Sequence, residues 1–362
     1  AGVARQRDGD RRSRSRPRMM LVTADDSTGA TEAGAACADA GLMVEVVPIG
    51  VAPAMAVSAE GCTVIDLRSR HLSAGEARRR IIASTDDTHR VHKIDSTLRG
   101  NWAAELSALV DGGRRVVMIP SHPRAGRVCI GGIVHVNGIP VAASELGNDP
   151  RLPVRSSRPS ETLSGAELAD SDALRRWLAT SASGAAIVDA VTLADIDQLA
   201  AIAFVVDDVV LAGPASVVEA VAKLCAPIGG SASLPDPLLP EPIVVVCASL
   251  HPVSREQIAR VAGAGIDVVT SSELRGSHPD VVAAEVAERA HRRVDEVRAR
   301  TVILVGGDTA EAFIGDSVVR VFGSIDVGVS LGDAEVRGRL LRVASKPGGF
   351  GTANTLLDLV TR

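Results

Sequence analysis

Residues 91–101, with the sequence VHKIDSTLRGN, crowd cations, a carboxylate and hydroxyls into a few positions. The groups are Lys93, Asp95, Ser96, Thr97 and Arg99. The two cations can bind an anion, the aspartate can accept a proton from a hydroxyl, and the hydroxyls can cap a helix or contact a substrate. The chain has 39 Lys and Arg residues, but only three are lysines. Because an ammonium and a guanidinium are not interchangeable, this scarcity favours a chemical role over a salt-bridged corner.

A second candidate site follows an expected strand at 19–24, where Asp25 and Asp26 stand side by side. Open α/β sheets bind ligands at the carboxyl ends of their strands. Adjacent carboxylates repel each other, which a simple turn does not require, so a functional role is favoured. Arg70, in the segment DLRSRHL, is a weaker third cation.

Two glycine-rich corners lie near the C-terminal end, in LVGGDTAEAF (304–313) and ASKPGGFGTAN (344–354). Their candidate ligand-binding residues are Gly306, Gly307, Asp308, Lys346, Gly348, Gly349 and Gly351. Glycine lets backbone N–H groups approach an anion, and a helix start adds positive potential. The pair of corners predicts phosphate binding, in which Asp308 would hold magnesium or cap the helix.

Composition excludes several classes of protein. A net charge of −5 and only 2% aromatic residues argue against nucleic-acid binding. The sequence has no zinc signature, no P-loop pattern and no complete G-x-G-x-x-G, and no apolar run is long enough to span a bilayer. The five cysteines are widely spaced, as expected for reduced core residues. We therefore expect a cytoplasmic enzyme with no nucleic-acid or membrane partner.

Alternating strand-like and helix-like segments predict an α/β fold with two domains, mostly parallel sheets and a cleft between them. The expected strands are 19–24, 62–67, 89–95, 114–120, 185–190, 208–213, 243–249, 266–271, 301–306 and 339–345. The expected helices are 30–40, 76–84, 101–112, 165–179, 192–202, 253–264, 279–299, 309–314 and 352–361. Asn137-Gly138 predicts a β-hairpin excursion within 131–144.

The same pattern predicts four segments along the chain. They are a disordered basic leader at 1–18, an acid-binding domain at 19–226, a linker at 227–242 and a nucleotide-binding domain at 243–362. The linker is rich in Pro, Gly and Ser, which interrupt helices and central strands.

Taken together, these stretches resemble the four-carbon acid sugar kinase family, whose members phosphorylate erythronate, threonate or 3-oxo-tetronate with ATP. The matching motifs are A-D-D-x-T-G-A at 24–30, K-x-D-S-T-L-R-G-N at 93–101, P-x-x-P-x-x-G-R at 120–127, V-x-G-x-P at 136–140, G-G-D-T-A at 306–310 and K-x-G-G-F-G at 346–351. The 93–101 motif matches without a change and is the most specific. The sequence differs from the family at 247–254, where His251 occupies a serine position.

The resemblance implies a division of labour between the two domains. Substrate binding would use Asp26, Arg70, Lys93, Asp95, Ser96 and Thr97. ATP binding would use Ser249, Gly306, Gly307, Asp308, Thr309, Lys346, Gly348, Gly349 and Gly351, with Mg²⁺ bridging the phosphates. The catalytic candidates are Asp25, Asp26, Lys93, Asp95 and Arg99.

In the expected mechanism, Lys93 and either Arg70 or Arg99 neutralise the substrate carboxylate. One of Asp25, Asp26 and Asp95 orients or deprotonates the hydroxyl, and the sequence does not choose among them. The partners are a sugar acid and ATP, and a homodimer is an open alternative.

Two other functions remain open at this point. A non-catalytic sensor of sugar acid or nucleotide would bind both ligands without forming ADP, and the altered segment 247–254 motivates it. An oxidoreductase would share the α/β layout, but the sequence lacks its dinucleotide fingerprint.

Overall fold

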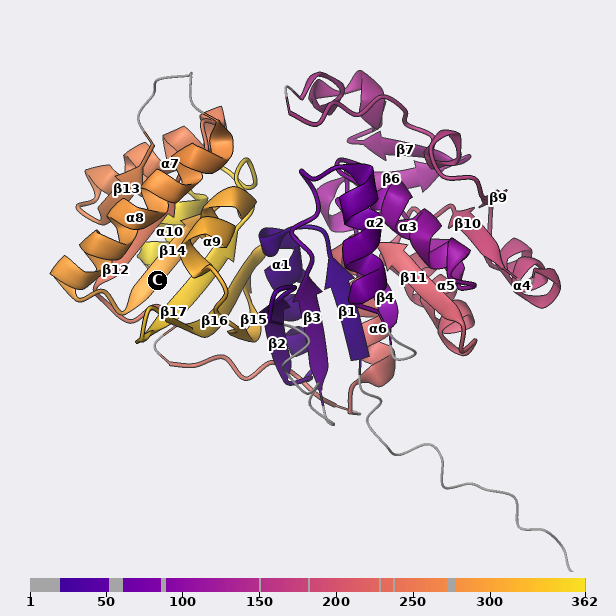
Figure 1. Ribbon diagram of the computed structural model, residues 1–362, viewed down its shortest axis with the longest axis horizontal. Coiled ribbons are helices and arrows are strands. Elements are labelled where there is room, and N and C mark those ends of the chain that lie inside the picture. Colours follow the sequence, from indigo (N-terminus) through magenta and orange to yellow (C-terminus); the bar gives the residue numbers. More distant parts are fainter. Residues whose placement is uncertain are drawn as a thin grey trace, which may run out of the picture.

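The computed structural model describes residues 20–51, 61–85, 89–149, 151–181, 183–227, 229–236, 238–271 and 278–361. The expected basic leader at 1–18 lies outside these residues. Figure 1 shows two lobes side by side. We call residues 20–226 the first lobe and residues 243–361 the second lobe. The division into domains at 227–242 stays a prediction.

The first lobe is built on parallel strands in the order β2-β3-β1-β4-β11-β5-β10-β9. Their bounds are β1 Met20–Ala24, β2 Val44–Pro48, β3 Cys62–Asp66, β4 His89–Lys93, β5 Arg115–Met118, β9 Ala166–Leu168, β10 Gly184–Val188 and β11 Val209–Gly213. Parallel strands are buried on both faces and read as continuous apolar runs, as β1 does.

The second lobe continues the same sheet in the order β13-β12-β14-β17-β16-β15. Its strands are β12 Ile243–Cys247, β13 Asp267–Thr270, β14 Thr301–Val305, β15 Val319–Asp326, β16 Val329–Val336 and β17 Arg339–Lys346. The first three and β17 are parallel, whereas β15 and β16 are antiparallel. β15 then pairs antiparallel with β2 of the first lobe, with Val321 opposite Val44. The described residues therefore form one 14-stranded sheet through both lobes.

Helices cover the sheet in both lobes (Figure 1). They are α1 Ser27–Asp39, α2 Ala74–Ala83, α3 Trp102–Asp111, α4 Ser171–Thr180, α5 Leu193–Phe204, α6 Ala215–Cys225, α7 Pro252–Gly263, α8 Pro279–Val297, α9 Gly307–Ile314 and α10 Thr355–Val360. Side-chain caps begin several of them; Ser73 accepts a hydrogen bond from Glu76 N and Asp170 accepts one from Ala173 N. No described helix combines the length and apolar character needed to cross a membrane.

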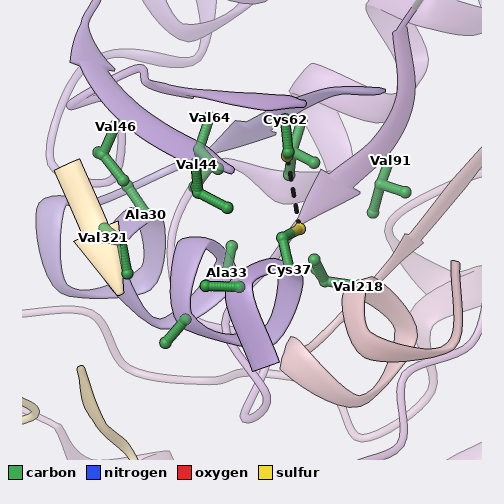
Figure 2. Packing of buried hydrophobic residues seen from close by; sticks show 14 of the residues in the cluster. Ala30, Ala33, Cys37, Val44, Val46, Cys62, Val64, Val91, Val218 and Val321 are labelled. Atoms are coloured by element: carbon green, nitrogen blue, oxygen red, sulfur yellow. Dashed lines mark hydrogen bonds between the residues drawn. The ribbon is translucent and has the colours of Figure 1, made fainter. Parts of the chain in front are cut away.

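Helix α1 packs where the two lobes meet (Figure 2). Its small residues let it lie close to strands of both lobes. A Cβ on Gly34 would come within 3.0 Å of Val46 in β2 and 3.2 Å of Val321 in β15. On the same helix, Cys37 Sγ lies 3.4 Å from Cys62 Sγ, and both thiols are buried and free. The hydrophobic core beside the boundary between the two lobes is aliphatic, as the low aromatic content requires.

The α/β fold class and the hairpin are confirmed. β7 (Ile133–Val136) pairs with β8 (Ile139–Pro140) across Asn137-Gly138, and β6 (Arg127–Ile130) completes a small three-stranded sheet. The expected helix at 165–179 was wrong at its start, because residues 166–168 pair with β10 and α4 begins only at Ser171. The sequence interpretation also omitted β2, α6, β15 and β16.

Candidate functional site

The ends of two neighbouring strands bring the two charged motifs of the first lobe together. β1 ends at Ala24 and β4 ends at Lys93, and these two residues are paired across the strands. Asp25 and Asp26 follow directly after β1. The acidic pair and the lysine motif, 67 residues apart in the chain, therefore share one sheet edge.

Asp25 is held rigidly by Arg70. The Asp25 side chain is fully buried, and its two oxygens accept hydrogen bonds from Arg70 Nε at 2.7 Å and Nη2 at 2.8 Å. Gly100 allows this approach, because a Cβ there would lie 3.2 Å from Asp25 Oδ2 and 3.1 Å from Arg70 Cγ. Arg70, which the sequence marked as a weak candidate, is thus at the centre of the cluster.

Asp26 combines a capping role with an unusual protonation equilibrium. Its Oδ1 accepts a hydrogen bond from Gly29 N at 2.9 Å and so caps α1, while Oδ2 accepts one from Arg70 Nη1 at 2.8 Å. Burial raises the pKa of Asp26 to about 6, with Arg70 and Lys93 opposing the rise and Asp25 adding to it. A carboxylate with this pKa is suited to accept a proton near neutral pH.

Lys93 lies beside this pair and has a partner that the sequence interpretation missed. Its Nζ is 3.1 Å from Glu32 Oε2, on α1, and 3.1 Å from where a Cβ on Gly29 would lie. Burial lowers the pKa of Lys93, but Glu32, Asp26 and Asp25 together raise it above its usual value. The side chain is therefore a buried, fully charged ammonium. Gly29 and Glu32 are three residues apart and so share one face of α1, but the sequence did not indicate that this face meets Lys93.

Asp95 organises its own turn. Its Oδ2 accepts hydrogen bonds from Thr97 N at 3.1 Å, the Thr97 hydroxyl and Arg99 Nε at 3.1 Å, while Oδ1 accepts one from Arg99 Nη2 at 2.9 Å. Burial alone would raise the pKa of Asp95, but Arg99 and Arg70 hold it well below its usual value. Such a carboxylate is a weak base. Among the described residues, Ser96 has no side-chain hydrogen-bond partner.

The first glycine corner of the second lobe lies directly against this cluster. Gly306 follows β14 with φ of +100°, and its N–H donates to Lys346 O at 2.8 Å. α9 begins at Gly307, where a Cβ would lie 2.7 Å from Asp26 Oδ2. Glycine is thus required for α9 to start beside the Asp26 carboxylate.

We expect Gly307→Ala to lower the free energy of unfolding by about 1–3 kcal/mol, because the added methyl would press on Asp26 across the boundary between the two lobes. Urea denaturation measures the change. Gly263→Ala is the matched control, since a Cβ at Gly263 would meet nothing within 4 Å. Equal stability of the Gly307 variant and the control would show that the lobes do not meet this closely.

The second glycine corner is folded back on itself. Lys346 is fully buried, and its Nζ donates to Pro347 O at 2.7 Å and Gly348 O at 3.0 Å. Burial lowers the pKa of Lys346 to about 8. Its ammonium orders the loop in this structure, and its contact with a nucleotide stays a prediction.

The segment at the end of β12 contacts the same loop. Gly348 lies close to Ser249, with 3.5 Å between its Cβ position and Ser249 Oγ. A Cβ on Gly349 would lie 2.7 Å from the ring of His251, so the imidazole packs on this glycine. Gly351 has φ of +89° and needs glycine for that turn. The residue that departs from the family pattern is therefore part of the candidate nucleotide corner.

Asp308 and Thr309, at the start of α9, contact different parts of the protein. Thr309 Oγ1 accepts a hydrogen bond from Ala248 N at 3.0 Å, which ties α9 to the end of β12. Asp308 Oδ2 accepts one from Arg151 Nη1 at 2.6 Å, and His71 Nε2 lies 3.5 Å from its other oxygen. Arg151 and His71 belong to the first lobe, so Asp308 joins the two lobes. The sequence interpretation missed both, because their distance from Asp308 along the chain carries no periodic signal.

The residues around Asp308 show whether this corner could bind Mg²⁺. In the part of the chain that the structure describes, no group of three or more His, Cys, Asp or Glu side chains is arranged to hold a metal ion. Nucleotide-bound Mg²⁺ commonly uses one or two carboxylates together with phosphates and water, so a single carboxylate can suffice. Asp308 fits that role if Arg151 moves away from it.

Comparison with known proteins begins with the family. Residues 20–221 match the family described as "Sugar-binding N-terminal domain". A D-threonate kinase of Salmonella typhimurium is 34% identical over 151 residues, covering 39% of this chain and 35% of that protein. A D-erythronate kinase of Heliobacterium modesticaldum is 27% identical over 221 residues, covering 56% of this chain and 49% of that protein. The chain thus matches about a third to a half of the length of these relatives.

Solved structures share the fold over nearly the whole chain. A domain of unknown function from Bordetella bronchiseptica, crystallised with citrate as a domain-swapped dimer, is 26% identical with a TM-score of 0.52, covering 94% of this chain and 97% of that one. A putative tRNA synthase from Salmonella typhimurium has a TM-score of 0.75 at 17% identity, covering 94% of this chain and 98% of that one. The second likeness concerns the fold alone.

Proposed function

Because the chain belongs to the family of the sugar-binding N-terminal domain, we propose that it transfers a phosphoryl group from ATP to a terminal hydroxyl of a four-carbon sugar acid. Relatives named as D-threonate, D-erythronate and 3-oxo-tetronate kinases support this reaction. The observation that carries the proposal is the contact between Asp26 and Gly307, which puts the charged cluster of the first lobe against a glycine corner of the second.

Asp26 is the proposed base among the three candidate aspartates. Asp25 has both oxygens engaged by Arg70, and Asp95 is held ionised by its own turn and Arg99. Asp26 has its pKa raised to about 6 and faces the second lobe at Gly307. It can therefore orient the substrate hydroxyl and take its proton as the oxygen attacks phosphorus.

The remaining work is positioning and charge neutralisation, which is most of what phosphoryl transfer requires. Backbone N–H groups at Gly307 and in the loop 348–351 would hold the phosphates, since glycine lets the backbone approach an anion. Lys93, a buried ammonium beside Asp26, would stabilise negative charge as it develops. Mg²⁺, when bound, neutralises phosphate charge, and Asp308 would hold it.

A coupled assay of ADP release tests the reaction. The panel should contain D- and L-threonate, D- and L-erythronate and the corresponding 3-oxo acids, each with Mg-ATP. We expect ADP release above the ATP-only background with at least one of these acids. If no acid raises ADP release above that background, the kinase proposal is wrong.

A sensor of sugar acid and nucleotide is the second candidate, favoured by one observation. The His251 ring packs on Gly349 in the loop proposed to hold phosphates. Calorimetry with Mg-ATP and the same acids separates the two functions. Binding of both ligands without ADP formation would support the sensor.

The proposal extends to assembly. The Bordetella bronchiseptica relative was crystallised as a domain-swapped dimer, which supports a homodimer for this chain. Sedimentation velocity would measure the mass in solution, and a monomer across the micromolar range would contradict this part of the proposal.

A further inference from the structure

Three cations in the charged cluster of the first lobe already have carboxylate partners. Arg70 pairs with Asp25 and Asp26, at 2.7 and 2.8 Å. The other two pairs are Lys93 with Glu32 at 3.1 Å and Arg99 with Asp95 at 2.9 Å. To bind a substrate carboxylate, each of these cations would have to share or give up a partner, and breaking a buried pair is costly.

Arg127 differs from these three cations. It begins β6, and its Nη1 donates to Ala125 O at 2.8 Å. Within the described ranges, no carboxylate lies within 4.0 Å of its guanidinium, and its buried Nε has no hydrogen-bond partner. A guanidinium stays protonated in proteins, so Arg127 carries a positive charge with no paired anion.

The backbone around Arg127 is fixed. Arg127 N and O are both hydrogen-bonded to His122, at 3.2 and 2.8 Å. Gly126, with φ of +71°, accepts a hydrogen bond from Asn137 N at 2.8 Å and so anchors this turn to the next strand. A ligand would therefore meet a guanidinium on a preorganised support, which reduces the entropy cost of binding.

Arg127 also lies near the sheet edge that carries the site. Strand β11 lies between β4 and β5, with Gly213 opposite Lys93 and Ala212 opposite Met118, and Arg127 follows the loop that leaves the carboxyl end of β5. Burial lowers the pKa of Arg127, whereas the charges of Asp95 and Glu32 raise it and that of Arg99 lowers it. Burial lowers the pKa of His122, the backbone partner of Arg127, while the charge of Glu32 raises it and that of Lys93 lowers it. The unpaired cation thus lies at the same edge of the sheet as the proposed base.

We propose that Arg127 binds the carboxylate of the sugar acid through its unpaired guanidinium. This inference rests on the proposed function and changes one assignment made from the sequence, which gave the carboxylate to Lys93 and Arg70 or Arg99. Those cations instead hold the resident aspartates and glutamate in place. The guanidinium fork matches a carboxylate with two parallel hydrogen bonds, which a single ammonium cannot reproduce.

The assignment has a consequence for specificity. A substrate carboxylate would neutralise the charge of Arg127, whereas a neutral sugar alcohol would leave that charge without an anion. The site should therefore distinguish a four-carbon acid from the tetritol of the same stereochemistry, and Arg127 should account for most of that discrimination.

Calorimetric titration without ATP tests this assignment apart from catalysis. The ligands are D- and L-threonate, D- and L-erythronate, and the neutral tetritols threitol and erythritol. The variants are Arg127→Met, which removes the charge, and Arg127→Lys, which keeps it. Arg124→Ala is the matched control, because Arg124 is three residues away, exposed and paired with Glu219. Thermal unfolding of each variant checks that it is folded.

For the acid that the unmodified protein binds most tightly, we expect Arg127→Met to weaken binding by at least about tenfold. Arg127→Lys should lose less, Arg124→Ala should bind as the unmodified protein does, and tetritol binding should not change with Arg127. Unaltered acid binding by folded Arg127→Met would overturn the inference, and so would equal losses for acid and tetritol. Arg127-dependent acid binding without any ADP release would support this inference while refuting the kinase.

Discussion

Lys93→Ala is expected to lower kcat by about 100- to 1,000-fold while leaving the affinity for Mg-ATP unchanged. The ammonium lies 3.1 Å from Glu32 and lowers the pKa of Asp26 by its charge. Its removal leaves several carboxylates facing one another at the point where negative charge must develop. Steady-state ADP release measures kcat, and calorimetry with Mg-ATP measures the nucleotide affinity separately.

The chain offers a matched control for this change. Lys223 is one of the three lysines, but it lies on α6 with 47% of its side chain exposed, paired with Glu219 at 3.0 Å. Lys223→Ala should leave kcat as it is. Because removing one partner of a buried pair can unfold a protein, Lys93→Arg, which keeps the charge, should retain more activity than Lys93→Ala. Normal turnover by Lys93→Ala would refute the role given to this lysine.

Asp26→Asn is expected to reduce kcat by about 100- to 10,000-fold, since it removes the proposed base. Asparagine caps a helix as well as aspartate does, so α1 should still begin at Ser27. Asp170→Asn is the control, because Asp170 also caps a helix, but that helix is α4, outside the site. Activity equal to that of the unmodified protein would exclude Asp26 as the base.

The pH dependence gives an independent test of the same residue. The base must be ionised, and the pKa of Asp26 is raised to about 6, so kcat/KM should be full above about pH 7, half of that at about pH 6, and fall about tenfold per pH unit below about pH 5. An ordinary aspartate would keep its activity down to about pH 4. A profile that stays flat down to pH 4.5 would contradict the assignment. The residual activity of Asp26→Asn should show no ionisation near pH 6.

The sequence predicted where the charged residues of the site lie better than it predicted which side chains contact one another. The strand-then-charge pattern at Asp25 and Lys93 placed both at carboxyl ends of strands, and the structure pairs these ends. It could not assign partners, because which cation meets which carboxylate depends on side-chain directions in the folded chain. Arg70 illustrates this, since only the folded loop brings it onto both Asp25 and Asp26. The roles of these residues in binding and catalysis stay predictions.

A helix or strand was predictable from the sequence wherever its segment showed hydrophobic periodicity or a continuous apolar run. β15 had a usable signal, because buried Val319 and Val321 alternate with exposed Arg320, yet the sequence interpretation omitted it. Its partner was beyond prediction from local pattern, since β2 lies more than 270 residues earlier in the chain. Tertiary pairing across such a separation is set by the packing of both lobes on α1.

The pairing of β15 with β2 restricts how the two lobes can move. Three residue pairs, from Val319 opposite Val46 to Val321 opposite Val44, carry the backbone ladder between them. Moving the lobes apart between β15 and β2 would break main-chain hydrogen bonds, whereas a sheet can change its twist while keeping them. The easiest relative motion of the lobes is therefore a change in the twist of the sheet that they share. We expect a ligand to enter as one lobe rotates against the other about the line between β15 and β2.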